Sequence, residues 1–201
     1  MIKALTSDIK NIDAHRFNEI TYPNKKISGK KFYNCHFKSC DFSETFFVHC
    51  EFNHCQFIEC NLNNIDVNNS KFEDVEFKHC KIMGVNWTSA YWRSVLLSSP
   101  LTFKECMINF SSFYGLTLEK ISIERCRSHD VDFREANLRG INFSHTDLKD
   151  SLFNNTDLTD ANFNDAENYD INLKNNTLKN ASFCRYEAVR LLSSLGINLL
   201  D

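Results

Sequence analysis

The sequence predicts an all-β fold: a right-handed quadrilateral parallel β-helix with a short C-terminal helix. Two observations carry this prediction. A large apolar residue recurs at every fifth position, and a smaller residue recurs two positions before it. Neither an α-helix nor a flat strand has a period of five, because their side chains repeat every 3.6 and 2.0 residues. A chain that turns one corner per repeat closes a square coil after four repeats, and each coil lies about 4.8 Å from the next.

The large apolar register runs through most of the chain in two phases. From residue 32 to residue 97, all fourteen fifth positions are large and apolar. From residue 103 to residue 183, fifteen of the seventeen are apolar, and the exceptions are Ser128 and Asn168. The preceding small register is rich in Cys, Ala, Ser and Thr, and the other positions are mostly polar. We therefore expect both registers to point inward, with stability arising from the stacking of coils.

Four repeats identify the motif: ANLRG (136–140), TDLKD (146–150), TDLTD (156–160) and ANFND (161–165). Each has a small residue, Asp or Asn, Leu or Phe, and then two mostly polar residues. This pattern resembles the pentapeptide-repeat family, and the resemblance extends over about residues 30–183. It implies a pentapeptide-repeat solenoid built for binding.

The chain is expected to have three parts: an irregular N-terminal cap (1–30), the β-helix (31–183) with a register break at 98–102, and a C-terminal segment (184–201). The cap keeps a faint repeat at Phe17, Tyr22 and Ile27. A basic cluster there favours a solvated rim over a nucleic-acid site; it consists of Lys25, Lys26, Lys30 and Lys31.

At the break, the apolar register shifts by one residue. Pro100 cannot donate a ladder hydrogen bond, which suits a bulge or a small projecting loop. A one-residue insertion without function and a partner contact both remain open. The candidate contact residues are Ser98, Ser99, Pro100 and Leu101. The nearby Trp87, Tyr91 and Trp92 are interpreted as core residues.

The C-terminal segment predicts a helix over 186–195, which Gly196 ends, and then a short strand over 197–200. The helix either caps the solenoid or forms a dimer. This segment resembles the ends of Qnr-type quinolone-resistance proteins, which implies a head-to-head homodimer. The middle stretch EFKHCKIMGVN resembles a microcin immunity protein of the same family. The expected dimer interface comprises Leu192, Leu195, Ile197 and Leu199.

No motif for chemistry is present. The string VHCEFNHCQF invites a zinc interpretation, but the repeat directs its Cys inward and its His outward, whereas metal ligands must converge. Nucleophile-elbow, zinc-protease, P-loop and dinucleotide-binding motifs are all missing. We therefore expect neither an enzyme, nor a cofactor or metal, nor a small-molecule substrate. No segment reads as a signal peptide or membrane span, so a cytoplasmic location is expected.

Charge is distributed unevenly. The whole chain carries a net charge of −3, which argues against direct nucleic-acid binding, whereas residues 127–170 contain ten acidic and four basic side chains. Stacking by 20 residues places several acids on one face: Asp130, Asp147, Asp150, Glu167 and Asp170. This face is either a solvated surface or a negative stripe that resembles duplex DNA. With the resemblance, it suggests a DNA mimic that binds DNA gyrase or topoisomerase IV; the alternative is a scaffold or immunity protein with another protein partner.

Overall fold

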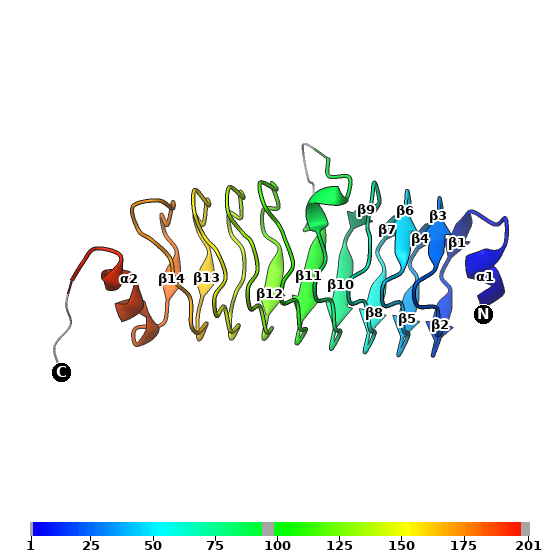
Figure 1. Cartoon of the computed structure of the whole chain (residues 1–201), viewed down its shortest axis with the longest axis horizontal. Helices are drawn as coiled ribbons and strands as arrows, with labels where there is room; N and C mark the ends of the chain where they lie inside the picture. Colours follow the sequence, from blue (N-terminus) through cyan, green and yellow to red (C-terminus); the bar gives the residue numbers. More distant parts are fainter. Residues whose placement is uncertain (1, 94–98, 198–201) are drawn as a thin grey trace.

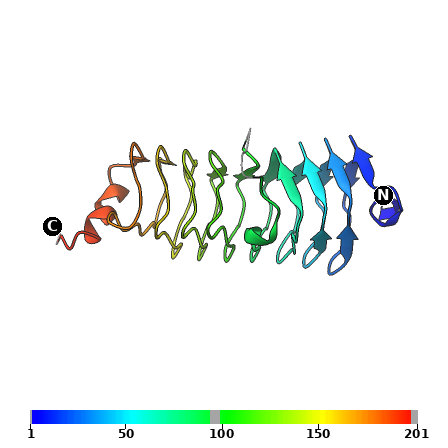
Figure 2. The same cartoon turned by 90° about the horizontal axis from the view of Figure 1, so that it is seen from above.

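The chain forms a rod of stacked square coils, all joined by parallel pairing (Figure 1). The structure is a computed structural model that describes residues 2–93 and 99–197. The rod has about eight turns, which confirms the predicted β-helix. The N-terminal helix α1 (Ile2–Thr6) and the C-terminal helix α2 (Arg190–Ser193) lie at opposite ends (Figures 1 and 2).

Short strands alternate with tight corners along each coil, and isolated bridges continue the parallel ladders between the named strands. Two 3-10 turns cover Trp87–Ser89 and Glu187–Val189. The strands are β1 (Asn11–Asp13), β2 (Arg16–Asn18), β3 (Lys26–Ser28), β4 (Lys31–Tyr33), β5 (His36–Lys38), β6 (Phe46–Val48), β7 (Glu51–Asn53), β8 (Gln56–Ile58), β9 (Lys71–Glu73), β10 (Val75–Lys78), β11 (Leu101–Lys104), β12 (Ser122–Glu124), β13 (Asn162–Phe163) and β14 (Ser182–Phe183).

The corners explain why so few glycines suffice. In most repeats, the residue two places after the large apolar one has a left-handed backbone with φ near +50° to +60°. Asn and Asp tolerate this conformation better than other non-glycine residues, because their short polar side chains can form local hydrogen bonds. Polar corner residues therefore bend the chain where a fold with ordinary turns would use Gly or Pro.

The interior is filled by the two predicted registers. Phe rings stack from coil to coil, with centroids 4.7 Å apart for Phe17 and Phe37 and 4.4 Å apart for Phe37 and Phe57. In the small register, thiols and hydroxyls donate to a backbone carbonyl in the preceding coil; Cys55, for example, donates to Phe32 O. The small position therefore both fills space beside the rings and ties adjacent coils together.

The N-terminal cap is shorter than the predicted residues 1–30, because the regular coil begins at β1 and, of the described residues there, only α1 and the few residues after it lie outside the repeat. Strands β1, β2 and β3 pair in register with β4, β5 and β6, and Ile12, Phe17 and Ile27 are buried. Lys30 is not on a solvated rim. It is 5% exposed, and its Nζ donates to the carbonyl oxygens of Ala4 (3.3 Å), Ser7 (2.5 Å) and Ile9 (2.6 Å).

The register break is an insertion of six residues, not one. Phe103 pairs with Phe77, 26 residues earlier, whereas the other coils repeat every 20. Trp87 is fully buried; Trp92 is half-buried, stacks on Phe72 and donates its indole N–H to Trp87 O at 2.9 Å. Both Trp are therefore core residues, whereas Tyr91 is half-exposed.

The C-terminal end departs from the repeat at Asn168. This residue takes the left-handed conformation (φ 57°), and Tyr169 is buried in its place between Phe163 and Phe183. The 3-10 turn Glu187–Val189 runs into α2, which is shorter than the predicted helix. The strand predicted over 197–200 is not seen at Ile197, which has no regular secondary structure, and residues 198–200 lie outside the described residues. Within the described part, no helix has the length and apolarity needed to span a bilayer.

Candidate functional site

The predicted acidic face lies along one edge of the C-terminal half. Asp130 and Asp150 occupy equivalent corners with φ 54° and 58°, and Asp130 N donates to Lys149 O of the next coil. Asp170 is exposed one coil further on but lacks the left-handed corner conformation, since the backbone changes at Asn168. Glu167 is exposed on the adjoining side. We call Asp130, Asp150, Glu167 and Asp170 the acidic edge; none has an ion pair within the described residues.

Asp147 differs from the other four acids because its carboxylate is occupied within the protein. It accepts hydrogen bonds from His129 Nε2 at 2.6 Å, Asn168 Nδ2 at 2.8 Å and Lys149 N at 3.2 Å. Burial tends to raise the pKa of Asp147, but the hydrogen bonds from Asn168 and His129 outweigh it and hold that pKa below its usual value. Asp147 therefore serves to join adjacent coils, and we leave it out of the acidic edge.

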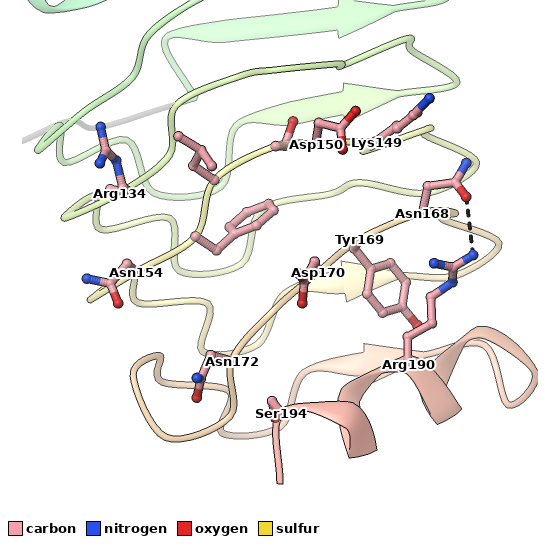
Figure 3. Close-up of a pocket in the computed structure, with 13 residues that line it drawn as sticks. Arg134, Lys149, Asp150, Asn154, Asn168, Tyr169, Asp170, Asn172, Arg190 and Ser194 are labelled. Carbon is pink, nitrogen blue, oxygen red and sulfur yellow. Dashed lines mark hydrogen bonds between the residues drawn. The ribbon is translucent and has the colours of Figure 1, made fainter. Parts of the chain in front are cut away.

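The same network reaches the C-terminal helix. Arg190 Nη2 donates to Asn168 Oδ1 at 3.3 Å, drawn as the dashed line in Figure 3, and Arg190 Nε lies 2.6 Å from Glu187 Oε2. Leu173 N also donates to Ser194 Oγ at 3.3 Å. These contacts fix the 3-10 turn and α2 against the last coil, so the end of the acidic edge is held in place.

An open groove runs beside the acidic edge (Figure 3). Its walls combine Asp150 and Asp170 with Arg134, Lys149 and Arg190. Tyr169 lies at its base with a buried hydroxyl that has no hydrogen-bond partner among the described residues, and burial raises the pKa of Tyr169 to about 12. A groove with mixed charge and an open form suits the surface of another protein better than a small substrate.

The residues predicted at the register break are mostly buried. Pro100 and Leu101 face the interior, because Leu101 occupies the small inward register beside Val75. The half-buried Ser99 donates its hydroxyl to Leu101 O at 3.0 Å, and Ser98 lies outside the described residues. The prediction of a partner contact is therefore wrong for Pro100 and Leu101.

The predicted dimer residues are only partly covered by the rod. Leu192 is half-buried, Leu195 and Ile197 are exposed, and Leu199 lies outside the described residues. Tyr186 and Val189, which the prediction did not include, are also exposed. The dimer stays a prediction.

The cysteines occupy the positions that the repeat assigned to them. Eight are buried in the small register, and Cys184 is half-exposed. Several His residues pair with acids instead, as in the 2.6 Å contact between His54 Nδ1 and Asp74 Oδ2. Within residues 2–93 and 99–197, no group of three or more His, Cys, Asp or Glu is arranged to hold a metal ion.

Three exposed apolar residues close to the acidic edge were not predicted from the sequence: Phe110, Tyr114 and Leu152. Phe110 and Tyr114 belong to the coil before Asp130, and Leu152 follows Asp150. Each lies outside both inward registers, where most residues are polar. That departure from the pattern is visible in the sequence and could have identified them.

Two family models match this chain. One, described as a pentapeptide repeat region, matches residues 30–100, and another, described as pentapeptide repeats (8 copies), matches residues 129–166. Together they cover more than half of the chain. No curated protein matches it.

Solved structures with similar coordinates include two trypsin-treated variants of QnrB1, a plasmid-mediated fluoroquinolone resistance protein. One has a TM-score of 0.60 at 21% identity, over 92% of this chain and 100% of its own. The other has a TM-score of 0.56 at 20% identity, over 95% and 99%. HetL, a pentapeptide repeat protein from the cyanobacterium Nostoc, has a TM-score of 0.43 at 16% identity, over 90% and 94%. The QnrB1 likeness shows a shared fold.

Proposed function

Because this chain belongs to the pentapeptide-repeat family, we propose that it is a DNA-mimicking protein that binds a type IIA topoisomerase, DNA gyrase or topoisomerase IV. Binding would protect the enzyme from a quinolone drug or a toxin. The fold shared with a fluoroquinolone resistance protein motivates the choice of partner.

The acidic edge is the observation that carries the proposal. Successive coils are about 4.8 Å apart, so Asp130 and Asp150 repeat along the rod at a spacing of the same order as the charges of a DNA strand. Their carboxylates are exposed and have no ion pair within the described residues. A rigid rod with such an edge can enter a basic surface that ordinarily holds DNA, and charge complementarity speeds that encounter.

This function requires shape and charge but no bond-making step. We infer that the protein is not an enzyme, acts in the cytoplasm, and forms a homodimer through its C-terminal end. Two-fold symmetry would join two acidic edges into one longer surface.

One observation favours the alternative, a scaffold or immunity protein that binds a different protein. The acidic edge does not continue through the N-terminal half, because the corner before Asp130 is Phe110, and Tyr114 is exposed nearby. A surface that mixes apolar and acidic groups is typical of a protein–protein interface, and it interrupts the continuous negative stripe that DNA mimicry would use.

The test removes charge from the acidic edge at nearly constant shape. The variant Asp130→Asn, Asp150→Asn, Asp170→Asn should bind DNA gyrase about tenfold more weakly at low salt, because complementary charges are lost. The difference should shrink at high salt, where screening weakens the wild-type contact. Surface plasmon resonance at two salt concentrations measures both effects.

A matched control removes three corner acids from the N-terminal half: Glu19→Gln, Glu44→Gln and Glu59→Gln. It changes the net charge equally and should leave binding unchanged. If the two triple variants weaken binding to the same extent, the effect is one of overall charge. If neither triple variant changes the affinity, and the wild-type affinity does not depend on salt, then the acidic edge is only a solvated surface.

A further inference from the structure

Phe110 is exposed at a corner where the equivalent residues are polar or glycine. Its side chain is 64% exposed. The same corner in other coils holds Asn24, Glu44, Asn64, Gly84, Asp130 and Asp150. The backbone ties this column together, since Gly84 N donates to Asn109 O and Phe110 N donates to His129 O. Phe110 therefore stands directly beside Asp130 at the start of the acidic edge.

The backbone at Phe110 is strained. Its φ is 61°, and no other Phe, Tyr, Trp or branched aliphatic residue in the described ranges has a positive φ. A bulky side chain in this region is a genuine outlier, whereas Asn and Asp tolerate it. Such strain concentrates at functional sites, where it persists despite its cost to stability. Because the Phe110 ring is exposed, it does not stabilise the core and so does not offset the cost of the backbone strain. A contribution to folding therefore does not explain why Phe occupies this corner.

The surroundings of Phe110 form a firm, partly apolar surface. Tyr114 and Leu152 are half-exposed on the side that follows the Phe110 corner, and the bridges Ser112↔Asp132 and Asp132↔Leu152 place that side in register. Between them, the Arg134 guanidinium lies 5.8 Å from the centre of the Tyr114 ring. Two hydrogen bonds to Asp132, at 2.9 and 2.8 Å, hold Arg134 in that position.

We propose that Phe110 is the apolar anchor of the acidic edge and inserts into an apolar pocket beside the basic surface of a partner protein. Charge complementarity selects the occupant: Asp130 and Asp150 favour a basic protein surface and repel nucleic acid, acidic membranes and the same edge of a second copy. Exposed aromatic residues with few rotatable bonds are common interface hot spots.

This inference rests on the proposed function and adds selectivity to it. Acidic groups alone attract any basic DNA-binding surface, whereas an aromatic anchor binds well only where the partner offers a matching pocket. Phe110 would therefore distinguish the topoisomerase from other proteins that bind DNA through basic surfaces.

The test is Phe110→Asn, which installs a residue already present at this corner in two other coils. The melting temperature should rise by about 2–4 °C, because the strain is relieved. Affinity for purified DNA gyrase should fall at least about tenfold, as at other hot spots. The loss should be similar at low and high salt, since an apolar contact is not screened. This independence of salt distinguishes the affinity loss of Phe110→Asn from the salt-dependent loss expected for the Asp130→Asn, Asp150→Asn, Asp170→Asn variant.

The control is Phe46→Thr. Phe46 is an exposed aromatic on the same side of the rod, in β6 of the N-terminal half, and its backbone is extended. Phe46→Thr should not change affinity; an equal loss would indicate general stickiness and overturn the proposal. Unchanged affinity or a lower melting temperature for Phe110→Asn would also overturn the proposal that Phe110 is an anchor. Neither result would contradict the proposed function. If wild-type protein does not bind gyrase, the inference and the proposed function fail together.

Discussion

Ser128 is a polar residue in a large apolar column, and replacing it with Ala should stabilise the protein. Ser128 is fully buried, and its hydroxyl has no hydrogen-bond partner among the described residues. The equivalent residues in the two adjacent coils, Ile108 and Leu148, are apolar and also fully buried. Ser128→Ala removes the hydroxyl and leaves the rest of the column unchanged.

The expected size of the effect follows from the desolvation of that hydroxyl. A buried polar group without a partner costs about 1–3 kcal/mol, so its removal should raise the free energy of unfolding by about 1 kcal/mol after the lost packing of the oxygen is considered. For a chain of this length, 1 kcal/mol corresponds to about 2–4 °C in melting temperature. Thermal unfolding followed by circular dichroism resolves such a shift.

Ser151→Ala is the matched control, because it removes a buried hydroxyl that does have partners. Ser151 Oγ donates to Ser128 O at 2.6 Å and accepts from Val131 N at 3.2 Å. Its loss leaves both groups unpaired and should lower stability by about 2 kcal/mol. A lower melting temperature for Ser128→Ala would refute the reasoning, since it would mean that the Ser128 hydroxyl is satisfied.

Three further predictions concern the core and the C-terminal end. Phe143→Asp buries an unpaired charge among Phe133, Phe153 and Phe163, so no soluble, cooperatively folding protein should be recovered, whereas Phe143→Leu should fold with reduced stability. Burial raises the pKa of Cys50 from 9.0 to about 11, so the unfolded chain loses this proton first, and the thiol should reduce stability by about 1.4 kcal/mol per pH unit between pH 9 and 11. Other buried thiols add to the wild-type slope, so urea titrations should show a slope for Cys50→Ser that is shallower than the wild-type slope by about this amount; equal slopes would contradict it. Leu192→Glu with Leu195→Glu should give a monomer by light scattering, unless the wild type is itself monomeric and the helix only a cap.

The coil architecture could be predicted because side-chain size alone repeats with a period of five. The N-terminal coil was missed for a local reason. Its small register contains Lys10, His15, Lys25 and Lys30. Lys30 is accommodated only because carbonyl oxygens of the N-terminal segment surround its ammonium group. Such a cap depends on three-dimensional geometry that the repeat pattern does not contain.

The candidate surface was predicted in outline but not in its contacts. Stacking by 20 residues correctly brought Asp147 and Glu167 into adjacent coils. It did not indicate that His129 and Asn168 would occupy the Asp147 carboxylate, because those side chains come from the coils on either side. Likewise, the six-residue insertion shifts the register by one, so the period of five could not reveal its length.

The most direct test of topoisomerase protection is a DNA gyrase supercoiling assay with ciprofloxacin, in the presence of increasing amounts of this protein. DNA mimicry predicts that wild-type protein restores supercoiling in a concentration-dependent manner. It also predicts that the Asp130→Asn, Asp150→Asn, Asp170→Asn variant, folded to the same extent, restores much less. Full inhibition by ciprofloxacin at every concentration of wild-type protein, together with no measurable binding to gyrase, would contradict the proposed function.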